Sequence, residues 1–262
     1  MSDGTTSPIL AGSPACAPYS DAGECPARWE GLATCVRERR HGLVLLLLLS
    51  IDAVFILLHV IHAYTGLLPG SQYSTETEGG YAEIYQHWKE VGITVLLLIL
   101  TYKRFNWTYL SWALLFGYLF LDDSLEIHET VGLKFSNYVG FVPMFDLRAR
   151  DFGELLFSAS AGLIILLLVS LAYYLSDEWT RNVARWLVAL LMAFACFAIV
   201  VDAGHQTIDD PRLRAAVGIF EDGGEMVVMS VLVWFVLCTV GSERQLAVRR
   251  RRLPSSAQPL DF

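Results

Sequence analysis

The chain has 262 residues, of which 54% are hydrophobic and only 18% are charged. An ordinary soluble domain is about 45–50% apolar and about 25% charged, so this composition argues against a soluble globular protein and favours a membrane protein. The formal net charge of −8 also argues against a nucleic-acid partner, because such proteins carry basic surfaces.

Residues 1–40 are predicted to form a disordered cytoplasmic tail. Prolines that would interrupt any helix recur along it, at Pro8, Pro14, Pro18 and Pro26. The tail shows no signal-peptide pattern, because it lacks a short apolar core followed by a cleavage site. It ends in Arg37-Glu38-Arg39-Arg40, which we interpret as a cytoplasmic anchor for the first span.

Long apolar runs then recur along the chain, and with their less apolar ends each approaches the roughly 20 residues that a spanning helix needs. They lie near 42–66, 91–102, 107–121, 155–175, 183–201 and 226–240. The sequence therefore predicts an all-α fold, a polytopic bundle of six transmembrane helices over residues 41–242. A basic cytoplasmic tail, 243–262, follows it.

Basic residues gather in the two tails, in the loop around Lys103 and Arg104, and in the loop around Arg181 and Arg185. Cytoplasmic segments of membrane proteins carry an excess of Lys and Arg, so both termini are predicted to be cytoplasmic. We expect a multi-pass protein of the inner (plasma) membrane, surrounded by the lipid bilayer.

The first span carries Asp52 near mid-depth and two histidines, His59 and His62, towards its outer end. The histidines are i, i+3 neighbours on one helix face, which favours a role as metal ligands; the alternative is hydrogen bonding between helices. Asp52 either connects an outer site to the cytoplasm or bonds to a neighbouring span.

The second span begins Gln86-His87-Trp88-Lys89-Glu90. Trp88 and Lys89 are typical of an interfacial girdle, and Glu90 is an alternative ligand that points into an outer site.

The third span leads into the sequence LDDSLEIHE, residues 121–129, after a run without charge. On one continuous helix Asp122, Glu126 and Glu129 would share an arc of roughly 60°. Three like charges on one face repel, so either some are protonated or a cation lies among them; we favour the cation. Asp123 and His128 are offset from this face. Residues 131–150 are expected to form the second outer loop.

The fourth span opens with Asp151-Phe152-Gly153-Glu154, where the helix dipole explains Asp151 better than Glu154. The fifth span ends in Asp202-Ala203-Gly204-His205, an i, i+3 pair of acid and imidazole. The sixth begins Glu221-Asp222-Gly223-Gly224-Glu225.

Because successive spans reverse direction, all these polar clusters are predicted to meet at the outer end of the bundle. Carboxylates combined with imidazoles suit a divalent transition metal (Zn, Fe or Mn), whereas carboxylates alone would suit Ca²⁺ or Mg²⁺. The predicted metal ligands are His59, His62, Asp122, Glu126, Glu154, Asp202, His205, Glu221 and Glu225. An unligated carboxylate, Asp123 or Glu129, is the expected catalytic general base.

The motifs LDDSLEIHE, DFGE and EDGGEM resemble those of uncharacterised bacterial multi-pass membrane proteins. The resemblance extends over most of residues 80–240 and implies no activity.

The pattern favours a metal-dependent membrane enzyme, a hydrolase or an oxidoreductase, that acts on a lipid or other small substrate at the outer (periplasmic or extracellular) face. Two alternatives stay open. One is a divalent cation or proton transporter or channel that uses the same acids, and the other is a structural membrane bundle.

Overall fold

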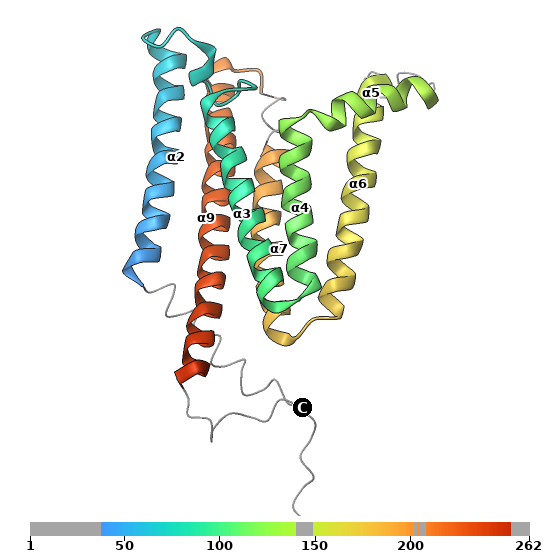
Figure 1. Cartoon of the computed structure of the whole chain (residues 1–262). Coiled ribbons are helices and arrows are strands. Elements are labelled where there is room, and N and C mark those ends of the chain that lie inside the picture. The colour runs from blue at the N-terminus through green and yellow to red at the C-terminus, as the bar shows by residue number, and fades with distance from the viewer. Residues whose placement is uncertain (1–37, 140–148, 202–203, 205–207, 253–262) are drawn as a thin grey trace, which may run out of the picture.

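The computed structural model describes residues 38–139, 149–201, 204 and 208–252 (Figure 1). Its helices are α2 (Arg39–Thr65), α3 (Tyr81–Arg104), α4 (Trp107–Ser124), α5 (Ile127–Val139), α6 (Ala149–Tyr174), α7 (Glu178–Ala195) and α9 (Pro211–Arg252). A 3-10 turn, η2 (Ser71–Tyr73), lies between α2 and α3, and a π-helical segment, η3 (Cys196–Val201), follows α7. The described residues form no strand, which confirms the all-α prediction.

Each of the six predicted spans corresponds to a helix or a helix pair: α2, α3, α4, α6, α7 with η3, and α9. The predicted N-terminal tail lies almost entirely outside the described residues. The last helix, α9, continues to Arg252, well into the segment expected as a C-terminal tail.

Four segments are long and apolar enough to cross a membrane. They are α2, residues 153–174 of α6, residues 178–201 of α7 and η3, and residues 212–243 of α9. Large apolar side chains on these helices face outward, such as Leu46 and Leu47 on α2 and Leu163 and Leu167 on α6. Apolar surface of this extent fits helices that could cross a membrane.

The centre of the bundle is formed by α3 and α4, which pack on each other and on α9 and α6, respectively. Their inner faces, with those of α7 and α9, supply fully buried side chains: Ile93, Leu97, Leu100, Tyr109, Trp112, Phe116, Trp179, Leu187, Met229 and Leu232. A helix surrounded largely by protein does not need an apolar surface on every side. Polar side chains at the ends of α3 and α4 are therefore compatible with their central position.

The third predicted span does not continue as one helix through the acidic motif. Its helix, α4, ends at Ser124, and Glu126 adopts the left-handed backbone conformation with φ 48°. A new helix, α5, begins at Ile127 and leads away from α4 (Figure 1). The prediction that Asp122, Glu126 and Glu129 share one helix face is therefore wrong, because the left-handed residue changes the direction of the chain.

The first part of the expected second outer loop, 131–150, is also helical, since α5 covers residues 131–139 and packs on α6, whereas residues 140–148 lie outside the described residues. Two glycines permit this close contact, Gly132 on α5 and Gly153 on α6. A Cβ atom added at Gly132 would lie 2.6 Å from the backbone nitrogen of Glu154, too close for the two helices to keep their spacing.

We expect Gly132→Ala to lower the stability of the protein by about 1–3 kcal/mol, because the added methyl group must push α5 away from α6. The matched control is Gly162→Ala on α6, where an added Cβ meets nothing within 4 Å. Alanine in a helix is favoured over glycine by about 0.5–1 kcal/mol, so the control should keep or gain stability. Thermal unfolding followed by circular dichroism in detergent measures both; equal behaviour of the two variants would contradict the α5–α6 contact.

Candidate metal centre

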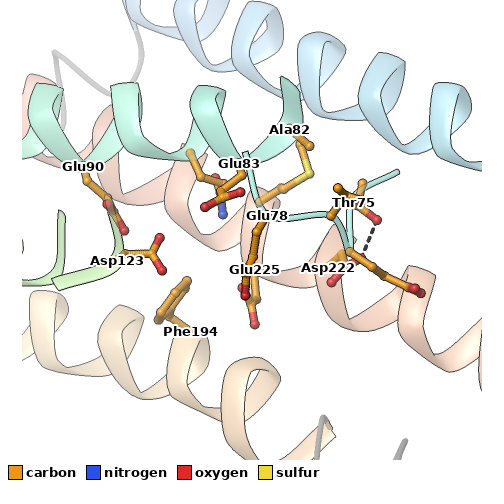
Figure 2. Close-up of a pocket in the computed structure, with 13 residues that line it drawn as sticks. Thr75, Glu78, Ala82, Glu83, Glu90, Asp123, Phe194, Asp222 and Glu225 are labelled. Carbon is orange, nitrogen blue, oxygen red and sulfur yellow. Dashed lines mark hydrogen bonds between the residues drawn. The ribbon is translucent and has the colours of Figure 1, made fainter. Parts of the chain in front are cut away.

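A cavity of about 310 Å³ lies at the end of the bundle where α3 begins (Figure 2). It is lined by residues 75–78 of the loop between α2 and α3, by α3, α7 and α9, and by the end of α4. Seven of its lining residues are acidic: Glu76, Glu78, Glu83, Glu90, Asp123, Asp222 and Glu225. No lysine or arginine is among the described residues that line it. The cavity is therefore suited to a cation.

Two of these acids form a candidate metal centre together with His87. Glu83 and His87 lie one turn apart on α3, and Asp123 reaches them from the end of α4. The His87 Nε2 atom is 2.8 Å from Asp123 Oδ2 and 3.9 Å from Glu83 Oε1. Each residue offers a ligand atom, and these atoms all lie within 4.8 Å of one another. In the described part of the chain, no other group of three such ligands meets this spacing.

The types of ligand in this triad define its chemistry. Two carboxylates and one imidazole suit Zn²⁺, Fe²⁺ or Mn²⁺. Three protein ligands leave a coordination position for water or substrate, as in catalytic zinc sites. Helices α3 and α4 pack against each other, and this contact holds the triad in place. The His87 ring also packs on Phe120 of α4 in a T-shaped arrangement, with 5.8 Å between the ring centroids.

A buried ionic cluster lies next to the cavity, deeper in the bundle. Lys89 Nζ donates hydrogen bonds to Asp52 Oδ1 at 2.9 Å and to the carbonyl oxygen of Met226 at 2.9 Å. Ser230 Oγ donates to Asp52 Oδ2 at 2.6 Å, so the cluster joins α2, α3 and α9. Charges at such depth are paired. Of the two alternatives for Asp52, bonding to neighbouring spans is the one observed.

This cluster also corrects the interpretation of Lys89 as part of an interfacial girdle. Lys89 is only 3% exposed, whereas its neighbour Trp88 is 70% exposed. The girdle interpretation therefore describes Trp88 and fails for Lys89. Successive residues of a helix point about 100° apart, which separates their environments.

Both histidines of α2 contact the loop that precedes α3. His59 Nδ1 accepts a hydrogen bond from the backbone nitrogen of Thr75 at 3.0 Å, and Thr75 Oγ1 donates to the Asp222 carboxylate. His62 Nδ1 donates to the carbonyl oxygen of Leu68 at 2.6 Å. These contacts position the acidic loop residues over the cavity, and neither histidine belongs to the triad.

The other predicted site residues are dispersed. Asp123 and Glu225 line the cavity, whereas Glu221 is buried on α9 outside its lining. Asp122 Oδ1 accepts from the backbone nitrogen of His128 at 3.0 Å and so caps α5. Glu126 is exposed at the break between α4 and α5, and Glu154 lies at the α5–α6 contact. The side chain of Glu129 and residues Asp202 and His205 lie outside the described residues.

The sequence interpretation missed Glu83 and His87 as a pair. Their i, i+4 spacing at the outer end of the second span places both on one helix face, and this spacing was available as a signal. The pair was overlooked because the residues around Trp88 were interpreted as an interfacial girdle.

Residues 86–240 match a family model described as a domain of unknown function (DUF8692). The match covers more than half of the chain, so the chain belongs to this family. No curated protein and no solved structure matches it. The family brings no function that can be transferred, in agreement with the resemblance to uncharacterised proteins. The matched range includes His87, Glu90, Asp123 and Glu225, and excludes Glu83.

Proposed function

We propose that this member of the family is a metal-dependent enzyme of the inner membrane, with a divalent transition metal bound by Glu83, His87 and Asp123. The observation that carries this proposal is the approach of three ligand atoms, two of them from residues that line an acidic cavity. A metal held by these three residues would supply Lewis-acid chemistry, which polarises a carbonyl or activates water. A cavity carboxylate outside the triad would be placed to accept a proton.

The proposed topology has six spans, with α3 and α4 counted because they pack between the other helices and expose apolar side chains such as Leu98 and Leu114. Both termini are cytoplasmic and the cavity faces the periplasm or the cell exterior. Two features support this orientation. The α3–α4 and α6–α7 turns lie at the end of the bundle opposite η2 (Figure 1). The helix ends next to these turns carry basic residues: Lys103 and Arg104 on α3, and Arg181 and Arg185 on α7.

Access from one side only favours an enzyme over a transporter. The Asp52–Lys89–Ser230 cluster and the packed core of α3, α4, α7 and α9 separate the cavity from the opposite end. The substrate is a lipid or another small molecule that reaches the outer face. The alternative, a divalent cation or proton transporter, is favoured by the excess of carboxylates in the cavity.

Elemental analysis of detergent-purified protein tests the metal centre. We expect about one equivalent of a transition metal in the wild type, and His87→Ala to weaken metal binding by at least about tenfold, because one of three ligands is lost. The matched control is His128→Ala, since His128 lies at the same end but contacts Asp122 outside the triad. A wild type without metal, or equal metal in both variants, would refute the proposal.

A further inference from the structure

Glu90 is a buried acid with an unused hydrogen-bonding atom in the cavity. The residue is 6% exposed, and its Oε2 atom has no hydrogen-bond partner among the described residues. Its carboxylate points towards Asp123 and into the cavity (Figure 2). The adjacent Lys89 does not bond to it, because Lys89 Nζ binds Asp52, Met226 and Ser230. A buried carboxylate without a partner is costly, so this atom indicates a missing cationic ligand.

The size of the cavity indicates that a metal ion does not fill it. Pockets for small organic molecules occupy about 300–1,000 Å³, and the 310 Å³ of this cavity lies at the lower end of that range. Glu83 and Asp123 of the triad lie in one part of the wall, and the lining continues along α9 to Asp222 (Figure 2). Space for a small organic molecule therefore lies beside the metal centre.

Acidic side chains line the cavity beyond the triad as well. Besides Glu83 and Asp123, the lining contains Glu76, Glu78, Glu90, Asp222 and Glu225. Thr75 donates a hydrogen bond to Asp222. Like charges at this spacing favour the binding of additional cations.

The apolar residues of the lining indicate which chemical groups the rest of the ligand contains. Phe194 of α7, Ala82 of α3 and Met226 of α9 line the same cavity as the acids. An aromatic face attracts both alkyl groups and cations, and a thioether packs against alkyl chains. The combination suits a short alkyl chain that carries positive groups, and it is a poor match for a hydrated inorganic ion.

We propose that the cavity binds a small aliphatic amine with two or more ammonium groups. One ammonium group binds Glu90, another lies among the acids nearer Asp222, and the alkyl chain packs on Phe194 and Met226. As the substrate class of the enzyme this inference rests on the proposed function, although binding of the amine is measured separately.

Isothermal titration calorimetry of the purified protein tests the amine site with 1,4-diaminobutane as the probe. The control ligand is 1,4-butanediol, which has the same chain length and no charge. We expect the diamine to bind and the diol not to bind. Glu90→Gln should weaken diamine binding roughly tenfold to hundredfold, because a charged hydrogen bond is lost. Glu178→Gln, at the opposite end of the bundle, should bind as the wild type does.

A diamine that binds no better than the diol, or equal diamine binding by Glu90→Gln and wild type, would overturn the inference. Should Glu90→Gln fail to fold, Glu225→Gln replaces it, and the comparison of diamine with diol on the wild type stands by itself. Glu90→Gln should keep its metal, because Glu90 is outside the triad. Metal without amine binding overturns only this inference, whereas amine binding by a protein without metal supports it and overturns the metal-dependent enzyme.

Discussion

Replacing Lys89 by methionine is expected to destabilise the protein by about 3–5 kcal/mol, because it leaves the Asp52 carboxylate buried without a cation. Asp52 is 1% exposed and Lys89 is 3% exposed, so water cannot compensate for the loss. Methionine has a similar length and fills the space of the lysine side chain, so little of the lost stability should come from an empty cavity. The measured loss should therefore report the unpaired charge, and the cluster should prove to be the main polar connection between α2, α3 and α9.

Thermal or denaturant unfolding in detergent, followed by circular dichroism, measures this effect. The matched control is Lys103→Met on the same helix, where the lysine is exposed and a change within about 0.5 kcal/mol is expected. The double variant Asp52→Leu, Lys89→Met should recover most of the lost stability, since it removes both charges. Equal stability of Lys89→Met and Lys103→Met would show that the buried pair contributes nothing.

A membrane-impermeant chelator is expected to remove nearly all of the bound metal from right-side-out membrane vesicles and little from sealed inside-out vesicles. The physical reason is that the triad lies at the cavity, while Asp52, Lys89 and the packed core separate it from the opposite end. Metal retained in each vesicle type after removal of the chelator is measured by elemental analysis.

Inside-out vesicles opened with detergent are the control for this experiment, and they should lose their metal. Loss of metal from both sealed orientations would favour the transporter alternative, because a transporter exposes its site to each side in turn. Loss from inside-out vesicles alone would place the cavity on the cytoplasmic side and would contradict the proposed topology.

Hydrophobicity along the chain was sufficient to predict the all-helical fold and a helix at each long apolar run, but not α5 or the extension of α9 to Arg252. Long apolar runs must satisfy their backbone hydrogen bonds within one helix, which makes this prediction independent of the neighbouring helices. The reversal of direction between successive spans also predicted that acids would meet at one end. Asp123 and Glu225 do line the common cavity.

The acidic motif after the third span shows where local periodicity was insufficient. A helical continuation through Glu126 fits the sequence as well as a break does. The break occurs at Glu126, whose backbone is left-handed. After the break, α5 packs closely on α6 at Gly132 and Gly153. These contacts join segments that the pattern around residue 126 does not contain.

The sequence by itself determined the fold class, the helices at the long apolar runs and the acidic character of one end of the bundle. Only the tertiary structure decided which polar groups meet, such as Lys89 with Asp52 and His87 with Asp123. The reason is rotational: each pair joins two helices, and the pattern within one helix does not fix how that helix is turned relative to its neighbours. Packing of α3 against α4 and α9 fixes that rotation, and with it the composition of the site.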